Sequence, residues 1–276
     1  MTIKIANQFP KYEFLQETIL REMSQLYKVR DRQTGQLAMI KVIDTVKTQK
    51  DNTRWGNIPT EGEISVLFDH PYIVKTLEHG FTSDGEQYLI TEHFEGITLC
   101  SILLVPRDIL GKRKIHYMRQ VAEAILEVHK TGFIHWDICT QNLIFNHDMS
   151  VLKLIDFGMA LPNKPPFTES SEWVGSPSFM APEVLRHEKK DTRLDIFSFG
   201  VTMYNLFCGK LPWGAGEAGV EAVKKNTPYT SIQSHCPTIN ETIVKAIHSC
   251  IEPDVNNRCP SMEHFLEMIQ GVETEI

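Results

Sequence analysis

The chain has 276 residues, 42% hydrophobic and 23% charged, which suits a soluble globular protein with two modest domains or one bilobal unit. Its net charge of −7 gives no electrostatic reason to expect binding to nucleic acid or to an anionic membrane. The six cysteines have no C-x-x-C spacing, no signal-peptide core begins the chain, and no apolar run approaches ~18 residues. A cytoplasmic protein with free thiols is therefore expected.

Strand-like sequence follows a short lead-in at residues 1–11. Residues 25–32 and 36–43 are rich in strand-forming residues, and the Gln-Thr-Gly sequence between them is a good hairpin turn. Lys41 lies inside the second of these runs. A lysine in an apolar strand commonly snorkels at an edge, so its position alone does not indicate a function.

A short helix is expected after this hairpin. Residues 44–60 are polar and predict a loop, and residues 60–71 then favour a helix that Pro71 stops. Thr60 has the side chain of an N-cap residue. The acids Glu61 and Glu63 would lie in the first turn, where a carboxylate complements the helix dipole.

Two further strands, at residues 72–80 and 87–94, precede a change in character. Gly96 breaks the pattern, and the sequence beyond it is mainly helical. We therefore predict an N-terminal part at residues 12–95 and a C-terminal part at residues 96–276. The first clear helix of the second part is residues 115–130, with Gly132 as its C-terminal stop.

Residues 135–158 carry the most distinctive polar pattern in the chain. Two short apolar runs on either side of an Asn-His-Asp turn predict a β-hairpin within this stretch. Asn142 would stand at the start of its first strand and Asp156 just after its second. Two oxygen ligands would then converge on one divalent cation, with Asp137 close by as a base.

The last third of the chain adds three more landmarks. Residues 175–183 read G-S-P-S-F-M-A-P-E and end in Glu183. An apolar helix within residues 193–213 contains Asp195 and is ended by glycine. Arg258 follows in the sequence D-V-N-N-R.

These motifs together resemble those of the eukaryotic-type protein kinase family, over roughly residues 12–270. The resemblance implies an α+β, bilobal fold, with an antiparallel β-sheet and one helix in the N-terminal lobe and a mainly α-helical C-terminal lobe. It also implies that nucleotide binds between the lobes. The resemblance is carried, in the family's order, by Lys41, a helix glutamate, Asp137, Asn142, Asp156, Glu183, Asp195 and Arg258.

Two neighbouring families share part of this pattern. The H-x-D-x-x-x-x-N motif also occurs in small-molecule phosphotransferases of the aminoglycoside and choline kinase type, but those enzymes lack the G-S-P-S-F-M-A-P-E segment and the helix with Asp195. The segment is similar to that of serine/threonine kinases, with Ser176 at the hydroxyl position that faces the catalytic aspartate. Tyrosine kinases show a different pattern there.

The resemblance implies ATP and Mg²⁺ as cofactors and gives each polar residue a role. Lys41 would orient the α- and β-phosphates and pair with a helix glutamate, for which we choose Glu61 over the alternative Glu63. Asn142 and Asp156 would hold Mg²⁺. Asp137 would be the catalytic base that accepts the proton of the substrate hydroxyl.

The adenine would be held by apolar side chains and by the backbone of the interlobe hinge. Leu26, Met39 and Ile144 are the expected apolar contacts, and Glu92 and Phe94 belong to the hinge. The partner implied is a protein substrate with a serine or threonine hydroxyl, or a protein that the domain regulates. The resemblance implies no nucleic-acid or membrane partner.

Four departures from the family weaken the case for catalysis. The phosphate-binding loop, at residues 19–26 by ungapped counting from Lys41, has no glycine, and Met39 stands where the family keeps a small alanine. The arginine before the catalytic aspartate is replaced by Trp136. The lysine two residues after that aspartate is replaced by Cys139, for which we consider both a redox switch and a neutral filler.

Without that arginine, phosphorylation of Thr168, Ser170 or Ser171 is not expected to act through the usual contact. Glu172, at the place of the family's phosphothreonine, lacks the same partner. Two functions therefore stay open: a serine/threonine kinase of weak or atypical activity, and a pseudokinase that serves as a binding, scaffold or allosteric module.

Overall fold

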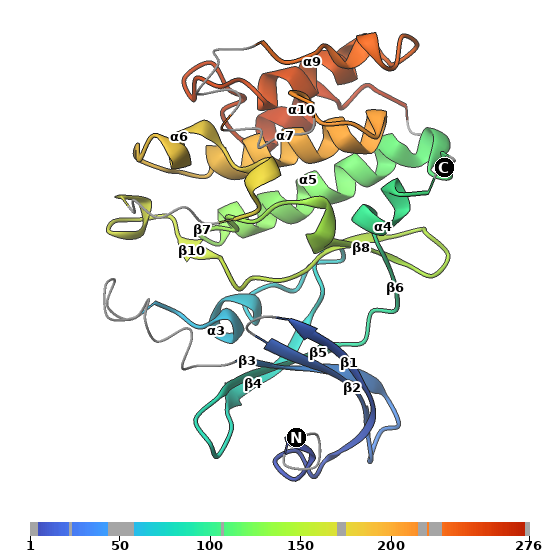
Figure 1. Ribbon diagram of the computed structural model, residues 1–276, viewed down its shortest axis with the longest axis vertical. Helices are drawn as coiled ribbons and strands as arrows, with labels where there is room; N and C mark the ends of the chain where they lie inside the picture. Colours follow the sequence, from blue (N-terminus) through green and yellow to red (C-terminus); the bar gives the residue numbers. More distant parts are fainter. Residues whose placement is uncertain are drawn as a thin grey trace. The chain divides into compact units, whose positions relative to one another are not determined.

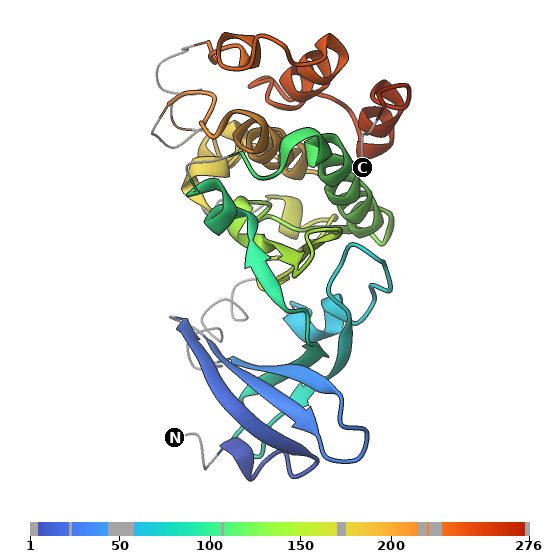
Figure 2. The ribbon, with the colours of Figure 1, turned by 90° about the vertical axis from the view of Figure 1, so that its right-hand side faces the viewer.

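The computed structural model describes residues 5–21, 24–43, 58–105, 108–169, 175–214, 220 and 228–273. The chain forms two compact units, Met1–Glu95 and Gly96–Ile276 (Figures 1 and 2). Unit 1 holds a five-stranded sheet and a short helix, and unit 2 holds most of the helices. The predicted α+β class, with a strand-rich first part and a mainly helical second part, is confirmed. No helix within the described residues is long and apolar enough to span a bilayer.

The sheet of unit 1 is antiparallel throughout, in the order β1-β2-β3-β5-β4. The predicted hairpin around residues 33–35 is present between β2 and β3. Asp31 closes its turn by accepting hydrogen bonds from the amides of Gln33, at 2.8 Å, and Thr34, at 3.0 Å. The strands are β1 (Tyr12–Arg21), β2 (Ser24–Asp31), β3 (Leu37–Ile43), β4 (Thr76–Phe81) and β5 (Gln87–Glu92).

Most of the stretch predicted as a phosphate-binding loop belongs to the ends of β1 and β2. The Cα pairs Ile19–Leu26, Leu20–Gln25 and Arg21–Ser24 continue the β1–β2 ladder almost to its tip, and residues 22–23 lie outside the described residues. Most of the predicted loop at residues 44–60 also lies outside them.

Buried and half-buried side chains alternate along β3, so the strand has a core face and an opposite face that carries Lys41. Ala38, Ile40 and Val42 are buried with Tyr27 and Val29 of β2. The side chains between them in sequence, at residues 39 and 41, are half-buried on the opposite face.

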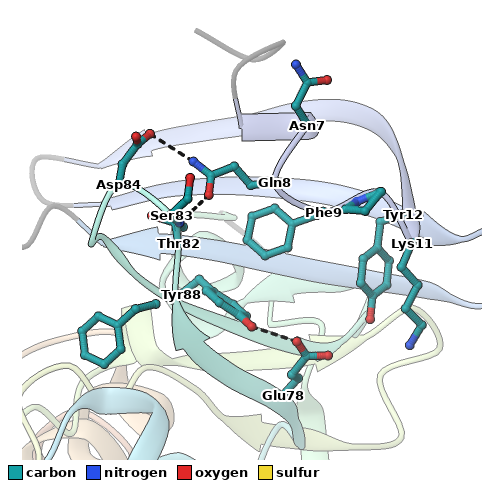
Figure 3. A pocket seen from close by; sticks show the side chains of 12 residues that line it. Asn7, Gln8, Phe9, Lys11, Tyr12, Glu78, Thr82, Ser83, Asp84 and Tyr88 are labelled. Carbon is teal, nitrogen blue, oxygen red and sulfur yellow. Dashed lines mark hydrogen bonds between the residues drawn. The ribbon is translucent and has the colours of Figure 1, made fainter.

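The N-terminal residues belong to the core of unit 1. Ile5, Phe9 and Tyr12 are buried, and the ring of Phe9 meets that of Tyr88 edge-on with centroids 4.9 Å apart. The Gln8 amide accepts from Ser83 N at 2.7 Å and donates to Asp84 at 3.0 Å (Figure 3). These contacts border a pocket of about 620 Å³, which none of the predicted site residues lines.

Helix α3 (Glu61–Ser65) begins as predicted and ends earlier than predicted. Thr60 is its N-cap, and Thr60 and Glu63 form a reciprocal capping box. The helix was expected to run to Pro71. It stops at Ser65, because the amides of Leu67 and Phe68 bond to carbonyls three residues back rather than four. The side chains of Phe68 and Ile73 then pack into the core.

The helices of unit 2 are arranged around α5 and α7, which run side by side in both views (Figures 1 and 2). The predicted helices at residues 115–130 and 193–213 are these two, and both end before a glycine of positive φ. The main helices are α4 (Leu99–Leu103), α5 (Lys114–Lys130), α6 (Pro182–Leu185), α7 (Arg193–Cys208), α9 (Glu241–Cys250) and α10 (Met262–Met268).

Two small sheets complete unit 2. The hairpin predicted within residues 135–158 is confirmed, since β8 (Leu143–Asn146) pairs with β9 (Leu152–Leu154). Strand β6 (Gly96–Thr98) pairs with the other edge of β8. Strands β7 (Phe133–Ile134) and β10 (Leu161–Pro162) form a separate two-stranded ladder. The first sheet fixes the backbone on both sides of the acidic residues discussed next.

Candidate active site

In unit 1, Lys41 and Glu61 form a nearly buried ion pair. The Lys41 Nζ lies 2.8 Å from both carboxylate oxygens of Glu61, and the two side chains are 14% and 6% exposed. Glu63 is engaged elsewhere, because its carboxylate accepts the Thr60 amide at 2.7 Å in the capping box. The geometry therefore selects Glu61 over Glu63 as the partner of Lys41.

The other predicted nucleotide contacts of unit 1 lie on the strands around Lys41. Leu26 of β2 is directly opposite Lys41 in the ladder, and Met39 shares the half-buried face of β3 with Lys41. Glu92, the last residue of β5, accepts the Lys75 amide with its carboxylate at 3.0 Å. Phe94 follows β5 and is half-buried.

In unit 2, each oxygen of the Asp137 carboxylate accepts its own N–H. The Ser176 amide donates to Oδ1 and the Asn142 side-chain amide donates to Oδ2, both at 2.8 Å. The Asn142 amide also donates to the Asp137 carbonyl at 2.8 Å. This set of bonds fixes the orientation of a half-buried carboxylate, as a positioned base requires.

Asn142 and Asp156 offer oxygen atoms from adjoining backbone segments. The Asn142 carbonyl accepts the amide of Ile155, the residue before Asp156, at 2.9 Å. The Asn142 nitrogen is committed to Asp137, so its Oδ1 remains as the acceptor end. Amide and carboxylate oxygens fit Mg²⁺, which commonly takes one or two protein ligands together with water and phosphate. Ile144, the predicted adenine contact of this unit, is half-buried on β8 between Thr98 and Lys153.

No cluster of three or more His, Cys, Asp and Glu side chains suited to a metal occurs within the described part of the chain.

Asp195, buried in α7, holds the backbone that precedes Asp137. Its carboxylate accepts the amides of His135, at 2.8 Å, and Trp136, at 2.9 Å, and its Oδ2 lies 2.9 Å from His129 Nε2. The predicted brace is thus confirmed. It stabilises a costly conformation, because Trp136 has a φ of 66°, which non-glycine residues rarely adopt.

Trp136 itself is an apolar replacement for a cation. Its side chain is buried, and its indole N–H has no hydrogen-bond partner among the residues that the structure describes. Gly175 lies against its carbonyl: a Cβ at Gly175, which has a φ of 105°, would come within 2.6 Å of that oxygen. A side chain at position 175 would therefore displace the Ser176 amide that binds Asp137.

Cys139 is a buried, neutral thiol beside the proposed base. Burial, reinforced by the negative charge of Asp137, raises the pKa of Cys139 to about 11, while a hydrogen bond with Ser176 opposes this rise. A thiol of this kind is a poor nucleophile near neutral pH. This favours the neutral filler over the redox switch for Cys139.

Of the activation-segment residues considered above, Thr168 is buried, and Ser170, Ser171 and Glu172 lie outside the described residues. The predicted pair of Glu183 and Arg258 is confirmed as a bidentate, fully buried ion pair with N–O distances of 2.6 and 2.9 Å.

Two contributors to the site could not be predicted from the sequence. One is the Ser176 amide, because every residue except proline has a backbone N–H and the residue type therefore does not reveal its role. The other is His129, whose only signal is its place at the end of a helix, 66 residues from Asp195. Neither pairing follows a local sequence rule.

Comparison with known sequences identifies the family. The profile of the protein kinase domain matches residues 22–268. The chain belongs to the protein kinase family. Membership of the eukaryotic type of this family explains why Lys41, the acidic residues and Asp195 occur in this order along the chain.

The relatives of this kinase domain carry kinase names. It is 29% identical over 238 residues, 84% of this chain, to the "Hormonally up-regulated neu tumor-associated kinase" of Homo sapiens, 32% of which is covered. It is 27% identical over 272 residues, 96% of this chain, to a "Probable serine/threonine-protein kinase" of Clostridium perfringens, 38% of which is covered. A "Probable serine/threonine-protein kinase 2" of Plasmodium falciparum is 32% identical over 195 residues, 70% of this chain and 36% of that protein. The chain thus spans about a third of the length of these curated relatives.

Proposed function

We propose that this domain is a serine/threonine protein kinase that transfers the γ-phosphoryl group of ATP to a hydroxyl of a protein, at a low rate. The observation that supports this most directly is the pair of N–H donors on Asp137, one 2.8 Å from each carboxylate oxygen. A carboxylate oriented in this way suits the alignment of an incoming hydroxyl. Relatives named as serine/threonine kinases support the same substrate class.

In this proposal each polar residue has one task. Lys41, held by Glu61, orients the α- and β-phosphates, and Asn142 and Asp156 bind Mg²⁺. Mg²⁺, when bound, supplies positive charge to the phosphate oxygens. Asp137 aligns the substrate hydroxyl and accepts its proton as the new oxygen–phosphorus bond forms and the bond between the γ-phosphorus and the β–γ bridging oxygen breaks, releasing ADP.

The adenine would be bound by the apolar side chains of Leu26, Met39 and Ile144, with the hinge at Glu92 and Phe94 supplying backbone hydrogen bonds. Met39 would narrow the space for the ring, since the family keeps alanine there. Cys139 would leave the transferred phosphoryl group without the cation that a lysine provides. A single charge-stabilising group at such a position is worth ~10²–10³ in rate, which is the reason for proposing slow transfer.

The test combines binding and transfer. Thermal unfolding is followed while ATP and Mg²⁺ are titrated, and radiolabel transfer to a generic protein substrate is measured for the wild type and for Asp137→Asn. Ligand at about 100 times its Kd stabilises the folded state by about 2.7 kcal/mol, so a rise of several degrees in Tm is expected. Transfer should be lost in Asp137→Asn while the rise in Tm persists.

A pseudokinase is the second candidate, favoured by the neutral Cys139 thiol and by the lack of glycine at residues 19–26. Nucleotide-dependent stabilisation without any transfer would support this alternative. Absence of stabilisation at about 1 mM ATP with Mg²⁺ would exclude the kinase proposal, because such weak binding leaves too little bound substrate. Transfer that survives in Asp137→Asn would show that Asp137 is not the base.

A further inference from the structure

Two cysteine thiols outside the candidate active site face one another in unit 2. Cys208 is the last residue of α7, and Cys236 follows the short 3-10 helix η5 (Ile232–Ser234). Their sulfur atoms are 3.8 Å apart, and both residues are partly exposed. A disulfide bond requires a sulfur separation of about 2.05 Å, so the two atoms need to approach by less than about 2 Å.

The segment that carries Cys236 is already attached to α7. The Tyr204 hydroxyl donates to the Thr230 carbonyl at 2.9 Å, and the Cys236 thiol contacts the Phe207 carbonyl at 3.4 Å. The Cys208 thiol contacts the Ile232 carbonyl at 3.9 Å. These contacts hold the two sulfur atoms close together in the folded protein, so the disulfide can form without unfolding.

We propose that Cys208 and Cys236 are a redox-modification site, which closes to a reversible intramolecular disulfide when the folded protein meets a peroxide. In the first step the Cys236 sulfur attacks a peroxide oxygen and the O–O bond breaks. Hydroxide departs as the leaving group, and Cys236 becomes a sulfenic acid. In the second step the Cys208 sulfur attacks the Cys236 sulfur, the S–S bond forms, and the S–O bond breaks. Two thiols and one hydrogen peroxide thus give one disulfide and two waters.

The order of the two steps follows from the environment of Cys208. Burial, together with the neighbouring Cys236, raises the pKa of the Cys208 thiol to about 12, which makes its thiolate scarce near neutral pH. We therefore assign the first attack to Cys236 and the resolving attack to Cys208.

The remaining thiols provide internal controls. Cys250 and Cys259 also interact with each other, but both are buried, so peroxide does not reach them in the folded protein. Cys100 is partly exposed, so its oxidation reports that oxidant reached the folded protein. The proposed chemistry thus predicts a different fate for each of these thiols in one sample.

The experiment treats the reduced, folded chain with increasing hydrogen peroxide, blocks free thiols with N-ethylmaleimide, and maps peptides by mass spectrometry without reduction. The expected product is a peptide cross-linked through Cys208 and Cys236, which dithiothreitol separates. Cys250 and Cys259 should become alkylated only after denaturation. Oxidation of Cys100 without this cross-link, or a cross-link that forms only in denaturant, would overturn the proposal.

Matched variants separate the two steps. Cys208→Ser should trap a sulfenic acid on Cys236 that dimedone labels, and Cys236→Ser should abolish both the label and the cross-link. Oxidised wild type should unfold roughly 5 °C above the reduced protein, because the bond closes a loop of about 27 residues. Both variants should lack this rise in Tm. An unchanged Tm in fully cross-linked wild type would refute the expected stabilisation by the disulfide. These outcomes do not depend on phosphoryl transfer.

Discussion

At Asp137 the two oxygens of one carboxylate accept N–H groups from Asn142 and from Ser176, on either side of it in the fold. These bonds leave the orientation of the carboxylate with little freedom, so replacing it with an amide would place an N–H against one of the two donors. The charge beside this carboxylate also differs from that of the family, because the neighbouring Cys139 contributes a neutral thiol where the family has a lysine.

The first prediction concerns Cys139. In Cys139→Lys, the long side chain can extend past the buried Cβ and bring its ammonium toward the phosphoryl group of the proposed transfer. We expect the rate of radiolabel transfer to rise by ~10²-fold, because developing negative charge gains a cation. Cys139→Ala, which adds no charge, should stay close to the wild type. A Cys139→Lys variant that binds ATP but transfers no faster would refute this role of position 139.

At the scale of elements, α7 is the scaffold of unit 2. It is apolar on nearly all sides, and it carries the Asp195 brace, the Ser198 hydroxyl bond to the Phe179 carbonyl at 2.8 Å and the Cys208 thiol. Gly200 allows α9 to approach it, since a Cβ at Gly200 would lie 2.6 Å from the Cys250 Cβ. The close contact of these helices depends on the absence of a side chain at one position.

The second prediction tests this contact. Gly200→Ala should lower the free energy of unfolding by about 1–3 kcal/mol through overpacking, even though alanine favours the helix by up to about 1 kcal/mol. Chemical denaturation measures the change. Gly271→Ala is the matched control, because a Cβ there meets no atom within 4 Å, and it should change stability little. Equal stability of the two variants would show that the α7–α9 contact relaxes freely.

The third prediction concerns His248 of α9, which accepts the Ile232 amide with its Nε2 at 3.2 Å. Burial lowers the pKa of His248 below its ordinary value of 6.5, so the folded state binds fewer protons than the unfolded state as the pH falls. Stability from this group is therefore present above pH 6.5 and is lost as the pH drops through the folded pKa.

His248→Gln removes the titration. We expect the unfolding free energy of the wild type to fall more steeply than that of the variant between pH 6.5 and about pH 5, as measured by urea denaturation at each pH. The buried His135, whose pKa burial also lowers, is retained in both proteins and cancels in the comparison. Parallel curves would mean that His248 does not titrate in this window.

At the scale of the molecule, Arg258 joins parts of unit 2 that are far apart in sequence. It pairs with Glu183 of α6, donates to the Arg193 carbonyl at 2.8 Å and to the Glu252 carbonyl at 3.0 Å, and lies over the Phe197 ring at 5.0 Å. The guanidinium is fully buried, so its charge depends on these partners for solvation.

The fourth prediction follows from that burial. Glu183→Gln or Arg258→Met should each destabilise the fold by about 3–5 kcal/mol, because each leaves an unpaired buried charge. The double variant should cost less than the sum of the two. Lys245→Gln breaks an exposed i,i+4 pair with Glu241, at 3.2 Å, and should cost less than about 0.5 kcal/mol. Additive single effects in the denaturation cycle would contradict a coupled pair.

Local chemistry made much of the fold predictable. The Gln-Thr-Gly turn, the Thr60 cap, the hairpin of β8 and β9, and the glycine that ends α7 each depend on residues close together in sequence. The end of α3 was not predictable in this way. Residues 66–71 have no strong helix breaker before Pro71, and the helix stops because Phe68 and Ile73 are drawn into the core.

Motif spacing and hydrophobic periodicity are properties of the chain, so the family, the division into a strand-rich and a helical part, and the residue types available for chemistry were all predictable from residue order. Which groups contact one another became known from the three-dimensional structure alone. It selected Glu61 over Glu63, assigned the Ser176 amide to Asp137 and His129 to Asp195, and brought the sulfurs of Cys208 and Cys236 to 3.8 Å. Such contacts join residues that are distant along the chain, and their geometry is set by the packing of whole elements, which no local pattern records.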